Sequence, residues 1–291
     1  GPLPVYPQGD QFLGGGNSLH SISEDQGREC LGFNRVVLST FNFSTGFYNL
    51  ALLNGCNRSA LSNGYGHDVY PRLSHGGNRV VFASSRNGNF EIYAVNVDNT
   101  GFAQLTNHPA TDTLPNWSPD GSKVVFTSTR DGNFEIYVMN ANGSGQTRIT
   151  NTPGFDEIYP VWSPDGSQLA WVQRVPNDPT GNGSIWIANS DGSGATKILD
   201  NLKFLSRLDW RPAYPAMPHE SSPQPQRFIF SYDATGNGWF DIGTFPLNGS
   251  TTQPIPNLLA GQLSDFEVGG WVPGKYGIYV YTKLLFINFE G

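Results

Sequence analysis

Short runs in which apolar and polar residues alternate follow one another along this chain. No stretch repeats its apolar residues at the 3.6-residue period of a helix. The runs are separated by turn-forming residues, and the chain has 35 Gly and 21 Pro, which favour tight turns. This pattern predicts an all-β protein made of many short antiparallel strands.

The runs are organised in a repeat of about 44 residues. Residues 68–111 and 112–155 are the clearest pair, in which NGNFEIY of the first is echoed by DGNFEIY of the second. A third copy begins at Asp156 and carries an insertion at 174–183. A fourth, more diverged copy covers about 205–262 and carries an insertion at 213–226. Each copy holds four short strands, which is typical of one blade of a β-propeller.

Partial copies flank these four repeats. The front copy shows a second, third and fourth strand, whereas the back copy shows a first, second and third strand. We therefore predict a single domain over 1–291, a six-bladed propeller of four-stranded antiparallel blades. An N-terminal strand would complete the last blade and close the ring, since closure removes an exposed sheet edge. The predicted blades are 17–66, 67–111, 112–155, 156–204, 205–262 and 263–291 with the N-terminal strand.

The motif Trp-Ser-Pro-Asp-Gly follows the first strand of two repeats, at 117–121 and 162–166. Pro-Asp-Gly is turn chemistry, and we expect the tryptophan to pack between blades. A platform for sugar stacking is the alternative role of these tryptophans. Together with the preceding D-x-x-P and the following G-x-x-x-I-Y, the motif resembles the PD40 repeat of TolB-like propellers, strongly over 68–200 and weakly over 17–67 and 201–291.

The resemblance concerns the propeller alone. TolB also has an N-terminal α/β domain, and we expect nothing before residue 28 to supply one. TolB is periplasmic and PD40 repeats are common in secreted bacterial proteins, so the resemblance implies an extracytoplasmic location, whether periplasmic, secreted or at the cell surface.

An acidic residue recurs just before the first strand of several repeats, which predicts a set of carboxylates on one face of the propeller. One interpretation is a hydrogen bond that ties neighbouring blades; the other is a ring that attracts a cation such as Ca²⁺ or a basic peptide. Two histidines, His67 and His108, fall near the same face. The candidate binding residues at this channel mouth are Asp68, Asp112, Asp156, Glu157, Asp265, His67 and His108.

Other ionisable residues recur in phase with the repeat. Glu91, Glu135 and Asp241 share one position on the third strand, and Arg86 and Arg130 share another. Their matching phase predicts structural pairing within blades, because an active-site acid usually breaks the repeat. The residues that do break it lie in the insertions, namely Asp178, His219 and Glu220.

The two cysteines, Cys30 and Cys56, fall in the first blade, before its second strand and in the turn after its third. In a four-stranded meander these two positions lie at the same edge of the sheet, so a disulfide is geometrically feasible. Two free buried thiols are the alternative.

The formal net charge of −7 and the absence of a basic run argue against a nucleic-acid partner. No apolar stretch approaches the ~18 residues of a transmembrane helix, so no membrane insertion is expected. No metalloprotease, nucleophile-elbow or phosphate-loop motif is present in the sequence, and no catalytic residue or cofactor is predicted.

These features leave three hypotheses. The chain is a non-catalytic module that holds a protein, peptide or glycan at the channel mouth. Alternatively, it is a glycoside hydrolase or polysaccharide lyase with carboxylates at that mouth, since a propeller can be catalytic without a recognisable catalytic sequence motif. In the third hypothesis it is a structural subunit of a surface assembly, whose N-terminal strand completes a neighbour's blade. The first is the main expectation, either for a monomer or for a subunit of such an assembly.

Overall fold

The structure is a computed structural model that describes residues 36–54, 57–62, 64–178, 181–203, 206–211, 226–232, 241–247, 253–254, 268–271, 277–280 and 285–288. All regular elements in these ranges are β-strands, and they pair in antiparallel sheets, so the all-β prediction is confirmed. None of the described segments is a helix of the length and hydropathy that a membrane crossing requires. The described chain falls into two compact units, residues 36–153 and 154–288.

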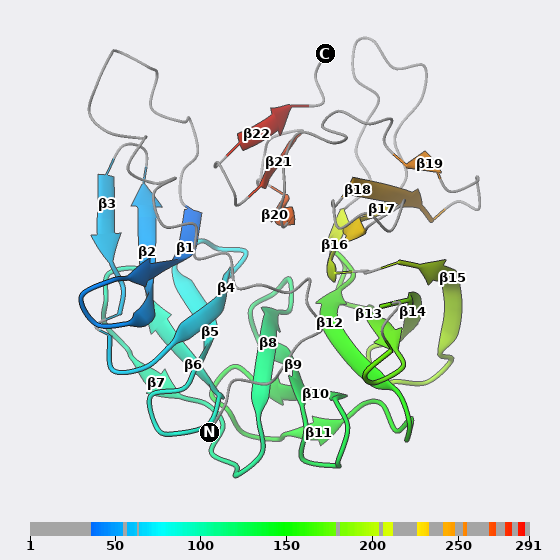
Figure 1. Cartoon of the computed structure of the whole chain (residues 1–291), viewed down its shortest axis with the longest axis horizontal. Helices are drawn as coiled ribbons and strands as arrows, with labels where there is room; N and C mark the ends of the chain where they lie inside the picture. The colour runs from blue at the N-terminus through cyan, green and yellow to red at the C-terminus, as the bar shows by residue number, and fades with distance from the viewer. Residues whose placement is uncertain are drawn as a thin grey trace. The chain divides into compact units, whose positions relative to one another are not determined.

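Three sheets build the first unit, and in each the strands pair with their chain neighbours as a meander (Figure 1). The first sheet has the order β1-β2-β3, the second β4-β5-β6-β7 and the third β8-β9-β10-β11. The strands are β1 Val36–Asn42, β2 Phe47–Asn54, β3 Asn57–Ala60, β4 Asp68–Leu73, β5 Arg79–Ser84, β6 Glu91–Asn96, β7 Ala103–Gln104, β8 Asp112–Trp117, β9 Lys123–Ser128, β10 Glu135–Asn140 and β11 Thr147–Arg148.

The second unit also contains meander sheets, with the orders β12-β13-β14-β15, β16-β17-β18-β19 and β20-β21-β22 among the described residues. The strands are β12 Asp156–Trp162, β13 Gln168–Arg174, β14 Gly183–Asn189, β15 Thr196–Leu202, β16 Ser206–Arg211, β17 Arg227–Tyr232, β18 Asp241–Pro246, β19 Gln253–Pro254, β20 Val268–Trp271, β21 Gly277–Val280 and β22 Leu285–Asn288.

The described sheets follow the predicted repeats, which confirms four-stranded antiparallel sheets of the kind that form propeller blades. The described part of the first repeat gives three strands, as the poorly marked first strand predicted. The number of blades, the closure of a ring and the single domain stay predictions. The N-terminal strand that would close the ring lies outside the described residues.

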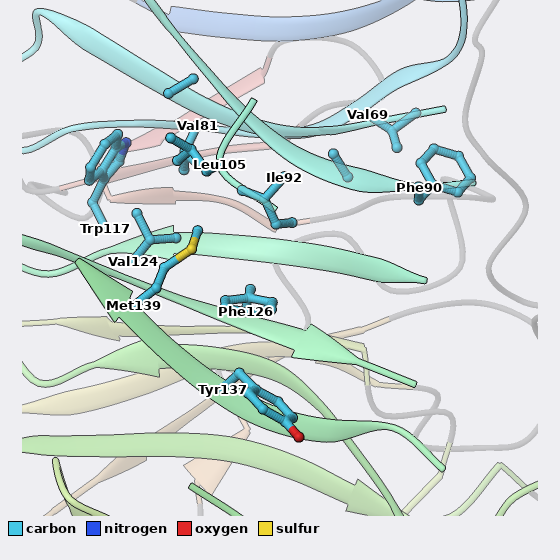
Figure 2. Packing of buried hydrophobic residues seen from close by; sticks show 12 residues of the cluster. Val69, Val81, Phe90, Ile92, Leu105, Trp117, Val124, Phe126, Tyr137 and Met139 are labelled. Carbon is cyan, nitrogen blue, oxygen red and sulfur yellow. The ribbon is translucent and has the colours of Figure 1, made fainter. Parts of the chain in front are cut away.

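The second sheet is apolar on both faces because alternate residues of its strands point to opposite sides. Phe82 and Tyr93 pack with Leu50 and Leu52 of the first sheet. On the other face, Val81 and Ile92 belong to a cluster shared with the third sheet, which also includes Trp117, Val124, Phe126, Tyr137 and Met139 (Figure 2). Two cores therefore join the three sheets of this unit.

Trp117 lies in the second of these cores, 5% exposed, and links two sheets directly. Its indole N–H donates to the carbonyl of Arg72 in the neighbouring sheet at 3.2 Å. The guanidinium of Arg79 lies 5.3 Å from the centre of the Trp117 ring. The same guanidinium donates to the carbonyl of Ala141 at 3.3 Å. The prediction that this tryptophan packs between blades is confirmed as packing between sheets.

The Ser-Pro-Asp-Gly turn after Trp117 is held by its own aspartate. Asp120 Oδ1 accepts from the Ser118 hydroxyl at 2.6 Å and from the Ser122 amide at 3.0 Å. These hydrogen bonds, that from Ser118 first, lower the pKa of Asp120 to about 2. Gly121 takes the left-handed conformation that closes the turn, with φ +71°.

A β-bulge interrupts the first strand of each four-stranded sheet in the first unit. The register shifts between Val69 and Arg72 in β4, and between Thr113 and Asn116 in β8. Within each bulge a residue with positive φ, Tyr70 or Leu114, precedes a proline. A proline has no N–H to give to the ladder, so it fits where pairing is already broken.

Two glycines with positive φ provide a matched test of sheet-to-sheet packing. A Cβ on Gly143 would lie 2.5 Å from the carbonyl oxygen of Leu105, whereas a Cβ on Gly121 would meet nothing within 4 Å. We expect Gly121→Ala to lower the free energy of unfolding by about 1 kcal/mol, the cost of the left-handed conformation. Gly143→Ala should cost more, because the neighbouring backbone must also move. Urea unfolding would measure both, and equal losses would contradict this packing.

Candidate functional site: the buried acids and the histidines

The acids that begin β4 and β8 are fully buried and paired with arginine. Arg86 Nη2 lies 2.9 Å from Oδ1 and 3.1 Å from Oδ2 of Asp68. Arg130 Nη2 lies 2.8 Å from Oδ2 of Asp112. Asp68 and Asp112 have no exposed surface. Each partner belongs to the same sheet as its acid, so these two carboxylates pair within a sheet. The tie between neighbouring sheets at Asp68 is made by its carbonyl, which accepts from the Ser39 hydroxyl of β1 at 2.6 Å.

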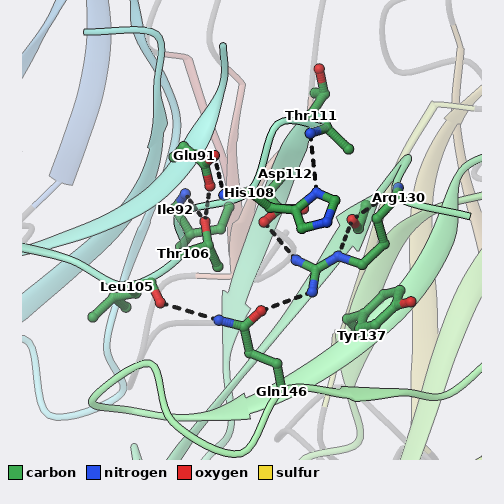
Figure 3. Close-up of polar contacts among 12 residues, drawn as sticks. Glu91, Ile92, Leu105, Thr106, His108, Thr111, Asp112, Arg130, Tyr137 and Gln146 are labelled. Carbon is green, nitrogen blue, oxygen red and sulfur yellow. Dashed lines mark hydrogen bonds and ion pairs between the residues drawn. The ribbon is translucent and has the colours of Figure 1, made fainter. Parts of the chain in front are cut away.

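Each arginine is held in a fixed orientation by further contacts. Arg130 Nε donates to Ser128 Oγ at 2.8 Å, and its Nη1 donates to Gln146 Oε1 at 2.9 Å. Figure 3 shows the guanidinium between Asp112 and Gln146, above the ring of Tyr137 at 4.5 Å. Arg86 repeats this arrangement with Ser84 at 2.9 Å and with the Tyr93 ring at 5.0 Å. A planar guanidinium suits combined pairing and stacking of this kind.

The glutamates that begin β6 and β10 fix the loop that leads to the next sheet. Glu91 accepts from the Thr106 hydroxyl at 2.6 Å, from the His108 amide at 2.7 Å and from Asn89 at 2.9 Å (Figure 3). Glu135 accepts from the Thr150 hydroxyl and, at 2.8 Å, from the Thr152 amide. Arg148 Nη2 also lies 2.9 Å from Glu135. Structural pairing within sheets is thus confirmed for Arg86, Arg130, Glu91 and Glu135.

In the second unit, the register of β12 assigns the repeated acid to Glu157 and not to Asp156. Asp68 faces Ser84 and Asp112 faces Ser128 across their ladders, and Glu157 faces Gln173 in the same way. The Gln173 amide donates to Glu157 Oε1 at 2.7 Å. The third repeat has one more residue between Asp156 and the proline of the bulge. An alignment that places Asp156 at the position of Asp68 and Asp112 is therefore off by one residue.

The two candidate histidines act as acceptors for backbone amides. His108 Nδ1 accepts from the Ala110 amide at 3.1 Å. His67 Nδ1 accepts from the Tyr48 amide at 3.4 Å, and its ring lies 5.3 Å from that of Phe47. Burial lowers the pKa of His67 below 6.5, and the nearby charge of Asp68 opposes this effect only in part. The neutral form of His67 is therefore favoured.

Several candidates fall outside the described residues: Cys30, Cys56, Asp265, His219 and Glu220. The disulfide thus stays a prediction. In the described ranges, no group of three or more His, Cys, Asp or Glu side chains is placed to hold a metal ion. The binding role of the acids and the Ca²⁺ site likewise stay predictions, as does a role for Asp178, whose carbonyl accepts from the Gly181 amide at 3.0 Å in the inserted loop.

One surface was missed by the sequence reasoning. Aromatic side chains gather at the β1–β2 turn and at the loop before β4, where Phe43 is 75% exposed and Tyr65 is 73% exposed. The signal that could have found it is the run of residues 36–57, which is rich in aromatics and has no charged residue.

The Asp112–Arg130 pair gives a stability prediction. Asp112→Ala and Arg130→Ala should each lower the free energy of unfolding by about 3 kcal/mol, because each leaves a desolvated charge without its partner. The double variant should lose less than the sum of the two, and chemical denaturation of all four proteins measures this coupling. Asp200→Ala is the control, since Asp200 pairs with Lys197 at the surface and should change stability little. Additive losses would contradict the pairing.

His67 gives a pH prediction. Because its pKa is lower in the folded state, its contribution to stability is complete above pH 6.5 and is lost as the pH falls through the folded pKa. The melting temperature of the wild type should therefore fall, relative to His67→Asn, between about pH 7 and pH 5. The asparagine retains an oxygen that can accept from the Tyr48 amide but does not titrate. Parallel melting curves for the two proteins over this range would refute the assignment.

Comparison with known proteins agrees with this architecture. Among solved structures, TolB from Acinetobacter baumannii is similar with a TM-score of 0.56 and 18% identity, over 74% of this chain and 50% of that one. A puromycin-hydrolyzing peptidase of Mycobacterium tuberculosis is similar with a TM-score of 0.55 and 17% identity, over 90% of this chain and 45% of that one. At these identities the likeness concerns the fold, and the chain spans half or less of each protein.

No curated protein matches the chain in a sequence comparison. A family model does match, and it covers residues 37–201, more than half of the chain. That span includes the two repeats with the Asp–Arg pairs and the Trp-Ser-Pro-Asp-Gly turns. The chain therefore belongs to the PD40 family, the TolB β-propeller domain.

Proposed function

We propose that this chain is a non-catalytic module that binds another protein outside the cytoplasm. Its membership of the TolB propeller family supports both parts of the proposal, since TolB-like propellers bind proteins and TolB is periplasmic. We further propose that the sheets are blades of a six-bladed ring closed by an N-terminal strand. The count of about six repeats supports this arrangement.

The observation that carries the proposal is the engagement of the repeated acids. Asp68, Asp112, Glu91 and Glu135 are all buried, and their carboxylates accept hydrogen bonds from arginine, threonine or backbone N–H groups of the first unit. A general acid or base must reach a substrate and exchange a proton with it. Carboxylates fixed in this way hold strands and loops in place, and the loops then present the surface for binding.

The proposal predicts saturable binding without turnover. The full chain should bind members of a phage-displayed random peptide library, with dissociation constants measurable by biolayer interferometry. It should not cleave a panel of peptide p-nitroanilides, nor depolymerise oligogalacturonate, beyond the rate of a heat-denatured sample. If the chain turns over one of these substrates and loses that activity when it is unfolded, the chain is an enzyme and the proposal is wrong. If the chain binds arrayed glycans and enriches no peptide from the library, its partner is a carbohydrate and not a protein.

A further inference from the structure

Six aromatic residues come from one end of the first sheet and from the loop that leads to the second. They come from the end of β1, from the β1–β2 turn and the start of β2, and from the loop that precedes β4. We call this set the uncharged aromatic surface, and its residues are Phe41, Phe43, Phe47, Tyr48, Tyr65 and His67.

Five of the rings form a continuous series of contacts. The centre of the Phe41 ring lies 5.1 Å from that of Phe43 and 5.1 Å from that of Tyr48. The ring of His67 lies 5.7 Å from Tyr48 and 5.3 Å from Phe47. In all four contacts the ring planes are inclined to each other by 46–86°, so the rings meet edge-to-face or tilted, which is the favoured arrangement for aromatic pairs.

Tyr65 joins this series because its loop lies against the β1–β2 turn. A Cβ added to Gly64 would lie 3.3 Å from Cγ2 of Thr45 in that turn. On the other side of the loop, a Cβ on Gly66 would lie 2.5 Å from the amide nitrogen of Arg86. The loop is therefore enclosed between two segments, and the backbone that carries Tyr65 lies next to the turn that carries Phe43.

Phe43 and Tyr65 are the most exposed large hydrophobic residues in the described chain, at 75% and 73%. A single exposed aromatic residue is ordinary, but two at the rim of a continuous aromatic cluster make an apolar patch. Such patches on soluble proteins mark sites of interaction.

The charge of the surroundings selects the chemistry of the partner. Residues 36–57 and 59–67 contain no Asp, Glu, Lys or Arg, although charged residues make up 14% of the chain. The cores of protein interfaces have the same composition, enriched in aromatic residues and depleted in charged ones. Arg58, between these ranges, is the one charged residue from 36 to 67, and its guanidinium donates to the Thr40 hydroxyl at 3.2 Å. A charged partner would therefore lose solvation at Phe43 and Tyr65 for little counter-charge, so the surface fits an uncharged segment.

The polar groups of the β1–β2 turn are used within the turn. Asn42 Oδ1 accepts from the amides of Ser44 at 2.9 Å and Thr45 at 3.4 Å. Thr45 Oγ1 accepts from the Phe47 amide at 3.4 Å. These bonds fix the turn that presents Phe43, and a contact residue fixed in advance loses little entropy on binding.

We propose that the uncharged aromatic surface is a docking site for an uncharged segment of a partner protein, which places apolar side chains against Phe43 and Tyr65. This inference rests on the proposed function as a protein-binding module and names the surface that performs it. The surface adjoins one of the buried acids, because His67 directly precedes Asp68, but its exposed residues Phe43 and Tyr65 are not among the contacts of that acid.

The test compares peptide binding by the wild type with binding by Phe43→Ser, Tyr65→Ser and the double variant. Peptides selected from a random phage-displayed library on the wild-type chain should carry Leu, Phe, Trp or Met and few charged residues. Their dissociation constants should rise about thirtyfold for each substitution, the loss expected for a residue that dominates an interface. Phe155→Ser is the matched control, because Phe155 is another exposed aromatic residue and lies outside this surface, in the segment between β11 and β12. It should leave binding unchanged.

Thermal unfolding of each variant confirms that it is folded before binding is compared. If selected peptides bind the double variant as well as they bind the wild type, the docking site is overturned while the binding function stands. If no peptide is enriched on the wild type, the proposed function fails together with the site. Neutral glycans that bind the wild type and not the double variant would assign the surface to carbohydrate and overturn the protein partner.

Discussion

Each four-stranded sheet in the first unit needs a neighbour, because a sheet that is apolar on both faces is stable only when both are covered. The second sheet shows this most directly. Phe82 and Tyr93 face one neighbour, whereas Val81 and Ile92 face the other. Burial of this apolar area is the main stabilising contribution, and the polar contacts act within the frame that it sets. The tryptophan at the end of β8, the bulges within β4 and β8 and the tight turns all bring these faces together.

The polar network adds specificity to this frame. A buried ion pair such as Asp112–Arg130 contributes little net stability, since desolvation of the two charges offsets most of their attraction. Removing one member is costly, however, so the pair disfavours alternative registers of β8 and β9. The stacking of each arginine on a tyrosine of the third strand extends this effect across the sheet. Three of the four strands are thereby fixed around one guanidinium.

Much of this fold could be predicted from the sequence because the repeat carries it. The strands, the packing of Trp117 and the pairing of Arg86 and Arg130 within their sheets all follow from residues that recur in phase. The sequence named both Asp156 and Glu157 in β12. Because one extra residue precedes the proline there, only the ladder shows that Glu157 is the one that faces Gln173. The proline of the bulge was the better guide to register. The aromatic surface was missed because it lies where the repeat is weakest, so no periodic signal marked it.

The contacts of Trp117 also bear on how such a chain evolves. Its indole binds the backbone of the preceding sheet, and the arginine that covers it comes from that sheet too. The contacts of the repeated acids with arginine and threonine, in contrast, close within one sheet or its connecting loop. A duplicated repeat would therefore carry the contacts of its acids with it and would need only a joint of the Trp117 kind to its predecessor. Such a chain can gain or lose a repeat by recombination of its gene without inventing a new interface, and its loops are then free to diverge for different partners.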